Sequence, residues 1–146
     1  MSRIRGSDTR PEVQFRKGLF ALGYRYRLHR RDLPGKPDLV LPKYRAAVLI
    51  HGCFWHGHDC HLFRLPKTRR DFWRAKIESN RARDQRVRED LIASDWRVLT
   101  VWECSMRGYS RQDFEGLLRS VEAWLRGEAK CGELRGASRK TRNDYY

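Results

Sequence analysis

The sequence predicts an α/β domain in which a central sheet is flanked by helices. The length of 146 residues fits one domain. Short apolar or alternating runs, which are typical of strands, are interspersed with amphipathic stretches of helical period. Only a tight turn separates two of the expected strands, which favours an antiparallel hairpin. The expected order is helix, three strands, helix, strand, helix, arranged in two or three layers.

The helices are expected over residues 9–22, 70–94 and 113–126. At the start of the first helix, Thr9 can act as the cap, and Glu12 has the spacing of a capping box behind it. Gly23 is expected to end the same helix. The second helix is long and charged, and the third has a clear apolar face.

The strands are expected over residues 24–29, 38–41, 46–50 and 96–102. The first and the last of them alternate between apolar and polar residues, as in a strand with one exposed face. Residues 46–50 are continuously apolar, which is typical of a central strand buried on both faces. The turn over residues 42–45 is expected to join the second and third strands into the hairpin.

Basic residues dominate the composition and indicate a polyanionic partner. Lys plus Arg number 32 and Asp plus Glu number 18, which gives a formal net charge of +14. Nucleic acid is the first candidate, because neutralising its phosphates releases condensed counterions. An anionic membrane surface, RNA and the ribosome are the alternatives. We expect no membrane span, no signal peptide and a cytoplasmic location. Residues 1–126 are assigned to the domain and residues 127–146, which are polar and basic, to a flexible tail.

Cysteine and histidine gather in one short segment. Cys53, His58 and Cys60 lie within eight residues, and Cys104 follows the last strand as the natural fourth ligand. Thiolates and imidazole suit a tetrahedral Zn²⁺ site, and a site filled by four protein ligands is structural. The competing imidazoles, which leave the choice of histidine open, are His51, His56 and His61. The alternative is a set of buried free cysteines with surface histidines, and Cys131 lies outside the cluster.

Asp38 lies where a loop enters a strand, a position from which a carboxylate can hold Mg²⁺. The neighbouring hairpin strand ends at His51 and leads to His56. Phosphodiester hydrolysis needs a metal-bound carboxylate beside an imidazole base, because the metal offsets transition-state charge and the base activates water. The alternatives are a solvated or capping aspartate and a histidine that packs or binds zinc.

Two aromatic pairs, Phe54-Trp55 and Phe72-Trp73, lie near this segment. They can fill a small core, or they can stack on bases and wedge between them. For Phe72 we expect core packing. The helix behind it carries a basic surface expected to face phosphates, made of Arg74, Lys76, Arg81, Arg83, Arg86 and Arg88.

Three segments carry a resemblance to a known family: LPGKPD at residues 33–38, HGCFWHGHDC at residues 51–60 and VWEC at residues 101–104. Over about residues 4–124 the sequence resembles the very short patch repair DNA mismatch endonucleases. The resemblance implies a restriction-endonuclease-like α/β fold of the PD-(D/E)XK type, with a central mixed sheet and a structural zinc site. It also implies Mg²⁺-dependent nicking of duplex DNA on the 5′ side of the T in T·G mismatches, which arise when 5-methylcytosine deaminates.

The resemblance also assigns roles to residues. It makes Asp38 a metal ligand and His56 the catalytic histidine, with His51 and Glu12 as further active-site residues. At Ile50 it implies a metal ligand from the backbone carbonyl. The implied zinc ligands are Cys53, His58, Cys60 and Cys104. The aromatic residues implied to insert beside the mismatch are Phe54, Trp55 and Trp73. The Glu and Lys that are usual in the wider nuclease superfamily are missing after the hairpin strand, and histidines take their place.

These expectations describe a monomeric enzyme that acts on DNA at the nucleoid, with recruitment by mismatch-repair proteins as a further expectation. One alternative is a related Mg²⁺-dependent nuclease without a mismatch preference. Another is a zinc-stabilised DNA-binding protein without catalysis. Nicking of a T·G duplex, compared with a matched T·A duplex, separates the three.

Overall fold

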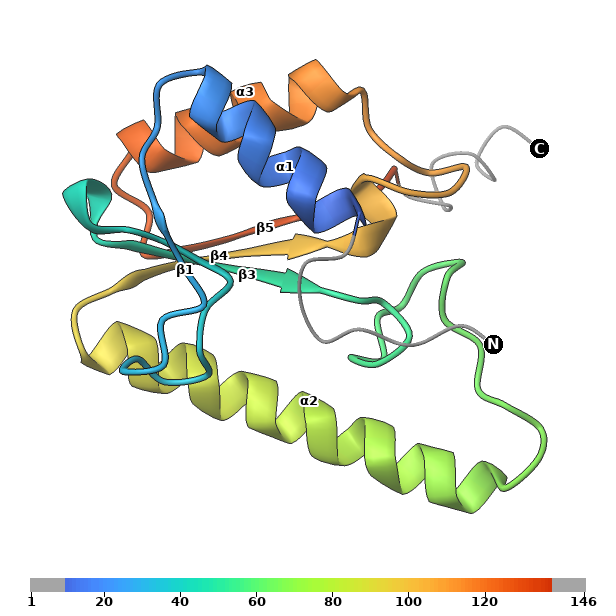
Figure 1. Ribbon diagram of the computed structural model, residues 1–146. Helices are drawn as coiled ribbons and strands as arrows, with labels where there is room; N and C mark the ends of the chain where they lie inside the picture. The colour runs from blue at the N-terminus through green and yellow to red at the C-terminus, as the bar shows by residue number, and fades with distance from the viewer. Residues whose placement is uncertain (1–9, 138–146) are drawn as a thin grey trace.

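The alternating and apolar runs of the chain form a five-stranded mixed sheet, and the amphipathic runs form helices against it. The computed structural model describes residues 10–137. Its elements are α1 (Arg10–Ala21), β1 (Arg27–Leu28), β2 (Leu39–Leu41), η1 (Pro42–Tyr44), β3 (Ala46–His51), α2 (Arg70–Ala93), β4 (Arg97–Trp102), η2 (Glu103–Ser105), α3 (Phe114–Arg126) and β5 (Cys131–Leu134). Figure 1 shows α1 and α3 over one face of the sheet and α2 over the other, which makes three layers.

The strands lie in the order β1-β2-β3-β4-β5. β1, β2 and β3 pair antiparallel, whereas β3, β4 and β5 pair parallel. The predicted hairpin is confirmed, because Leu41 pairs with Ala46 across the short turn between β2 and β3. β3 is central, as its apolar run predicts. Since β3 and β4 are parallel, their carboxyl ends lie side by side, with His51 opposite Trp102.

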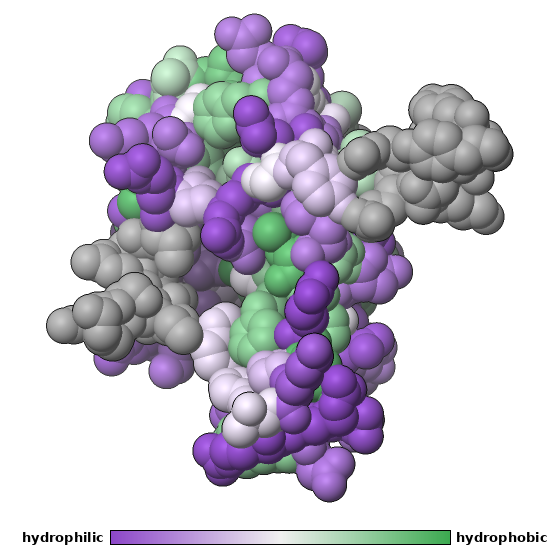
Figure 2. All heavy atoms as spheres, turned by 90° about the vertical axis from the view of Figure 1, so that its right-hand side faces the viewer, coloured by the Kyte–Doolittle hydropathy of each residue, from purple (hydrophilic) through white to green (hydrophobic). Residues whose placement is uncertain are grey.

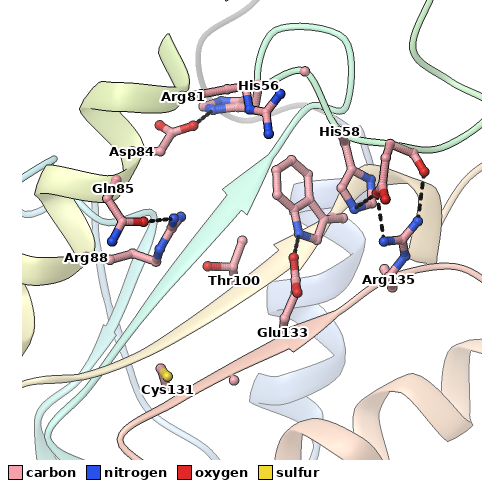
Figure 3. A pocket seen from close by; sticks show the side chains of 14 residues that line it. His56, His58, Arg81, Asp84, Gln85, Arg88, Thr100, Cys131, Glu133 and Arg135 are labelled. Carbon is pink, nitrogen blue, oxygen red and sulfur yellow. Dashed lines mark hydrogen bonds and ion pairs between the residues drawn. The ribbon is translucent and has the colours of Figure 1, made fainter. Parts of the chain in front are cut away.

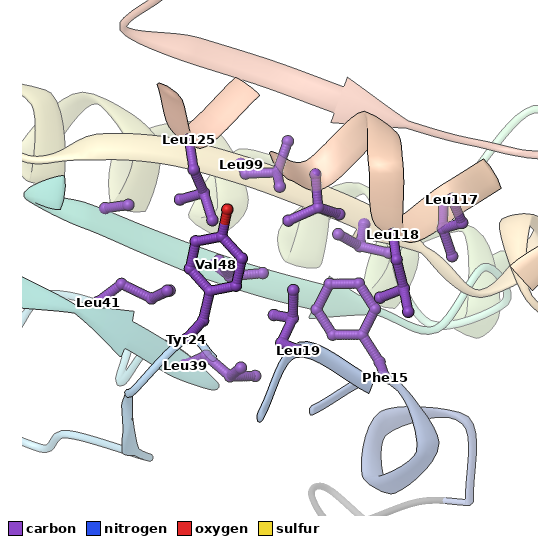
Figure 4. Close-up of a cluster of buried hydrophobic side chains, with 13 residues drawn as sticks. Phe15, Leu19, Tyr24, Leu39, Leu41, Val48, Leu99, Leu117, Leu118 and Leu125 are labelled. Carbon is purple, nitrogen blue, oxygen red and sulfur yellow. The ribbon is translucent and has the colours of Figure 1, made fainter. Parts of the chain in front are cut away.

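Successive side chains of β3 enter two different cores. Ala46 and Val48 belong to the core beneath α1 and α3, whereas Ala47 and Leu49 belong to the core beneath α2. This is the alternation expected of a strand covered on both faces. Figure 4 shows the first core, whose labelled members are Phe15, Leu19, Tyr24, Leu39, Leu41, Val48, Leu99, Leu117, Leu118 and Leu125.

The helix α2 is longer than the sheet that it covers. Leu91, near its carboxyl end, is fully buried against β3 and β4, and Ile77 is buried nearer its start. Figure 1 shows the first turns of α2 projecting past the carboxyl ends of the strands. A part of the helix therefore reaches beyond the domain core, beside the loop that follows β3. Within residues 10–137, none of the helices is long and apolar enough to cross a membrane.

The first strand is shorter than predicted. The alternation over residues 24–29 yields only the two-residue strand β1. Tyr24 instead packs in the main core, and its hydroxyl lies 2.9 Å from the Glu122 carboxylate of α3. The predicted cap Thr9 lies outside the described residues, whereas Gly23 has a φ of 101° just after α1, as expected of a glycine that ends a helix.

The prediction of a flexible tail from residue 127 is wrong for residues 131–134. These residues form β5, which extends the sheet parallel to β4. The strand alternates between exposed and half-buried residues at the sheet edge and contains a glycine, so it has no apolar run to reveal it. A side chain at Gly132 would collide with Trp124 of α3, which explains the glycine there. Residues 138–146 lie outside the described part of the chain.

Candidate functional site

The four residues predicted to bind zinc come together behind the carboxyl ends of β3 and β4. One ligand atom from each of Cys53, His58, Cys60 and Cys104 lies within 4.8 Å of all the others. The Nδ1 atom of His58 is 3.5 Å from the sulfur atoms of both Cys53 and Cys104. Among the histidines that the sequence left as candidates, His58 is the one whose ring faces the sulfur atoms.

Backbone amides surround these sulfur atoms. The amide of Leu62 donates to Cys60 Sγ at 3.4 Å, and that of Cys104 donates to Cys53 Sγ at 3.3 Å. Gly136, just after β5, donates to Cys104 Sγ at 3.3 Å. Donors of this kind stabilise thiolates, the form of cysteine that binds metal. The cluster therefore has the ligand set, the spacing and the polar surroundings of a metal centre.

The loop segment between Cys53 and His58 is held close to α2. Gly57 has a φ of 61°, and a Cβ there would lie 2.5 Å from Ile77 of α2. The position therefore requires glycine for both its conformation and its space. In the same loop, the carbonyl of Trp55 accepts a 2.8 Å hydrogen bond from the side-chain amide of Asn80. These contacts fix the position of the loop residue His56 relative to α2.

His56 pairs with a carboxylate that the sequence reasoning did not identify. Its Nδ1 atom lies 2.5 Å from Oδ2 of Asp84, a residue of α2. A carboxylate at Nδ1 favours the tautomer with the proton on that nitrogen, which leaves Nε2 as an acceptor. The pair has the geometry of a general base held in position by an acid.

His51 lies directly against this pair. Its ring is stacked on that of His56, with centroids 3.9 Å apart and planes 2° apart. Burial, followed by the neighbouring His56, lowers the pKa of His51 to about 3. The imidazole of His51 is therefore neutral at physiological pH.

A second cluster forms at the same end of β3. Asp38 accepts a 2.6 Å hydrogen bond from the backbone amide of Ile50, the residue before His51. Glu12 of α1 and His29, just after β1, join Asp38, and one ligand atom from each lies within 4.8 Å of the other two. Burial raises the pKa of Asp38 to about 7, with a smaller contribution from the charge of Glu12.

A divalent cation fits this second cluster. Two carboxylates and an imidazole supply oxygen and nitrogen donors, and a cation would offset the burial that now disfavours the ionised form of Asp38. The hydrogen bond from the amide of Ile50 holds the carboxyl end of β3 against the Asp38 carboxylate. The role of its carbonyl as a ligand stays a prediction.

The predicted mismatch-reading residues form one aromatic group beside the loop. The ring centroids of Phe54 and Trp73 are 5.5 Å apart, and those of Trp55 and Trp73 are 5.8 Å apart. All three are half-buried and belong to none of the hydrophobic cores. The expectation that Phe72 packs in the core is wrong. It is 46% exposed beneath the guanidinium of Arg69, because this part of α2 projects beyond the sheet.

A cleft of about 700 Å³ is lined by His56 and His58. Its walls come from α2, β4 and β5, and Figure 3 shows His56 and Asp84 at one end of it and His58 with Arg135 at the other. Arg81 and Arg88 of α2 also line it. The lining therefore carries charges of both signs, since Asp59, Asp84 and Glu133 line the cleft together with the three arginines.

The surface around the site is strongly polar. Figure 2 looks onto the carboxyl ends of the strands and shows hydrophilic residues around a smaller apolar strip. Most of the basic residues predicted to face phosphates are exposed on α2, namely Arg74, Lys76, Arg81, Arg83 and Arg86, and Arg88 is half-buried. The basic surface thus begins on the projecting turns of α2, beside Trp73, and continues along the helix over the sheet.

Sequence reasoning missed Asp84 and His29. For Asp84 a signal exists, since Ile77, Asn80, Asp84, Val87 and Leu91 follow a three-four helical spacing. Asn80 and Asp84 are polar residues on the inward face of the helix, so each is expected to form a hydrogen bond with another part of the fold. His29 offers no such signal, because nothing in its neighbourhood along the chain points to Asp38 or Glu12.

Comparisons with known proteins identify several relatives of this chain. A family model described as DNA mismatch endonuclease Vsr matches residues 1–62. The chain is 40% identical over 134 residues to the DNA mismatch endonuclease Vsr of Escherichia coli, which covers 92% of this chain and 86% of that protein. It is 54% identical over 106 residues to the Type II nicking enzyme V.XorIIP of Xanthomonas oryzae pv. oryzae, covering 73% of this chain and 78% of the relative. To the Type II nicking enzyme V.NmeAIP of Neisseria meningitidis it is 41% identical over 124 residues, 84% and 89% of the two chains.

Proposed function

Because this chain belongs to the Vsr family of DNA mismatch endonucleases, we propose that it nicks duplex DNA on the 5′ side of the T in T·G mismatches. The observation that carries this proposal is the end of β3, where two groups of side chains meet. Asp38 binds the amide of Ile50, and the next residue, His51, stacks on His56. A carboxylate cluster and an oriented imidazole thus flank one strand end, as phosphodiester hydrolysis requires.

His56 is the proposed general base. Asp84 holds its Nδ1 atom, so Nε2 is free to take a proton from the attacking water. Positive charge that develops on the imidazole is stabilised by the adjacent carboxylate of Asp84. His51, neutral because its pKa is lowered by burial, supports the ring of His56 by stacking and adds no positive charge of its own.

The proposed cation ligands are Asp38, Glu12 and the carbonyl of Ile50. When bound, Mg²⁺ supplies a Lewis acid that offsets charge on the phosphate in the transition state. Asp38 is suited to this role because its burial, which raises its pKa to about 7, favours a partner of positive charge. The metal at the Cys53, His58, Cys60 and Cys104 cluster is proposed to be Zn²⁺, with a structural role, since all four positions are filled by protein ligands.

The aromatic group is the proposed mismatch reader. A T·G pair stacks less well than a matched pair, so separating it from its neighbour costs less. Phe54 and Trp55 belong to the loop that carries His56, and their rings contact each other and Trp73 of α2. A ring inserted beside the mismatch would therefore bring the DNA backbone near the imidazole. The basic surface of α2 and the net charge of +14 provide affinity for duplex DNA in general.

The fold is proposed to be restriction-endonuclease-like. A hairpin of β2 and β3 carries Asp38 and the strand end, β4 joins β3 in parallel, and helices cover both faces. In this proposal Asp38 and Ile50 supply cation ligands from the hairpin, Glu12 supplies one from α1, and His56 acts from the loop after β3.

The test is nicking of end-labelled duplexes that contain T·G or matched T·A at one position. We expect cleavage on the 5′ side of the T, in the T·G duplex alone, and only with Mg²⁺. The variants Asp38→Ala and His56→Ala are expected to lose nicking while keeping affinity for DNA, because each removes chemistry and not phosphate contacts. Equal nicking of both duplexes would favour a nuclease without mismatch preference. Binding without nicking by the wild-type protein would favour a non-catalytic DNA-binding protein.

A further inference from the structure

We propose that His29 supplies a nitrogen ligand to the divalent cation held by Asp38 and Glu12, which makes this a mixed carboxylate and imidazole site. The proposal deepens the proposed function and rests on it, since it concerns the same cation site. Neither the sequence motifs nor the family resemblance assigns a role to His29.

The distances bring the imidazole of His29 within reach of both carboxylates. Its Nε2 atom lies 3.6 Å from Oε2 of Glu12, and its Nδ1 atom lies 3.9 Å from Oδ1 of Asp38. Two donors that each bind one ion at about 2.1 Å are at most about 4.2 Å apart. Either ring nitrogen therefore has the right separation to share a cation with the carboxylate that it faces. The other nitrogen would then face the second carboxylate, the usual arrangement around a metal-binding histidine.

The backbone holds His29 in this place. Its φ of 49° is in the left-handed region, which is uncommon for a residue other than glycine. Its amide donates a 3.1 Å hydrogen bond to the carbonyl of Asp38, the residue that its imidazole faces. Such a conformation is disfavoured for a residue other than glycine and persists where the surroundings impose it, often at functional sites. The ring therefore stays at the strand end that carries Asp38.

The cluster is partly exposed to solvent, so a hydrated ion can reach it. The side chain of His29 is 30% exposed and that of Asp38 is 17% exposed, whereas Glu12 is buried. His29 thus forms the solvent side of the cluster. Arg16, one turn further along α1, places its guanidinium 3.9 Å from Oε2 of Glu12.

A nitrogen ligand changes the selectivity of the site among cations. Mg²⁺ prefers oxygen ligands and a regular octahedral shell, whereas first-row transition ions accept imidazole more readily. A mixed site is therefore expected to bind Mn²⁺ more tightly than Mg²⁺, and His29 to contribute more to the affinity for Mn²⁺.

The experiment detects the nitrogen directly. Mn²⁺ is added to the full-length, zinc-loaded protein, and electron spin-echo envelope modulation reports whether a nitrogen nucleus is bound to the ion. The variants are His29→Gln, with His56→Gln as the matched histidine control and Asp38→Asn to show that the ion occupies this site. Mn²⁺ affinity is measured in parallel from the signal of the free ion, and melting curves confirm that each variant is folded.

We expect nitrogen modulation in the wild-type protein and in His56→Gln, and its loss in His29→Gln. The dissociation constant for Mn²⁺ should rise at least about tenfold in His29→Gln, as for loss of other groups around a metal. Absence of modulation in the wild-type protein, or its persistence in His29→Gln, would overturn the proposal whatever the stability of the variant. Mg²⁺-dependent nicking by a wild-type protein that lacks modulation would reject this ligand while supporting the proposed function. Nitrogen modulation in a wild-type protein that does not nick would support His29 as a ligand while contradicting the proposed function.

Discussion

The indole ring of Trp102 lies parallel to the imidazole ring of His58, with centroids 3.9 Å apart and planes 6° apart. The same indole meets the ring of His51 edge-on, with centroids 5.1 Å apart. Its N–H donates to the Glu133 carboxylate of β5. One side chain at the end of β4 therefore contacts both the cysteine-rich cluster and the stacked histidines. The packing of the cysteine-rich cluster and the position of His51 are linked through it.

Cys104→Ser is expected to lower the free energy of unfolding by more than about 4 kcal/mol, because loss of a structural metal is among the most destabilising changes. Wild-type protein should contain one zinc per chain, and the variant much less, by elemental analysis. Nicking should fall together with stability, since His58 and Trp102 support His51. Cys131→Ser is the control, because Cys131 is exposed on β5. A variant with unchanged melting temperature and a full complement of zinc would contradict this prediction.

Asp84→Asn is expected to slow nicking by about 10²–10⁴-fold, the usual contribution of a positioned acid or base. The amide can donate to Nδ1 of His56 and so favour the wrong tautomer. Single-turnover rates on T·G DNA provide the measurement. Asp90→Asn, an exposed change on the same helix, should leave the rate unchanged. If Asp84→Asn nicked at the wild-type rate, the contact with His56 would be structural only.

Asp38 is expected to make the Mg²⁺-free protein less stable as the pH rises. Its pKa is about 7 in the folded state and 3.8 ordinarily, so the folded protein holds a proton that the unfolded chain has released. Stability from this group is therefore greatest below about pH 4 and is lost progressively up to about pH 7, by up to roughly 4 kcal/mol.

Urea unfolding in Mg²⁺-free buffer at several pH values checks this dependence. The variant Asp38→Asn should gain stability relative to the wild-type protein as the pH rises, and adding Mg²⁺ should narrow the difference. Asp71→Asn, at a fully exposed carboxylate, is the control. If the free energies of unfolding of Asp38→Asn and of the wild-type protein changed with pH in the same way, Asp38 would be shown to ionise normally.

Trp55→Ala is expected to weaken action on T·G DNA by about tenfold to a hundredfold, since stacking on a base contributes roughly 1–3 kcal/mol. The preference of the variant for T·G over T·A DNA should be smaller than that of the wild-type protein. Its general affinity for duplex DNA should be unchanged, and high salt should abolish that affinity in both proteins. Phe20→Ala, a change of an exposed aromatic residue on α1, is the control. Unfolding of Trp55→Ala would assign the ring to packing, and a folded variant with its full T·G preference would place recognition elsewhere.

The sequence by itself determined the parts of this protein that depend on neighbours along the chain. The helices, the hairpin of β2 and β3 and the central position of β3 follow from local periodicity. The cysteine-rich cluster was readable because three of its four ligands lie within one loop, so only Cys104 had to come from elsewhere. Asp38 and His56 stood out because their residue types suit hydrolysis at positions next to strands.

The tertiary structure alone decided which distant residues complete each group. Asp84 reaches His56 across 28 positions, because α2 packs on the sheet with its inward face toward the loop. His29 meets Asp38 only because β1 pairs with β2, and β5 exists only because β4 offers an open edge to a weakly apolar segment. Such contacts depend on how separate elements pack, and the local pattern of residues that forms each element does not specify its partners.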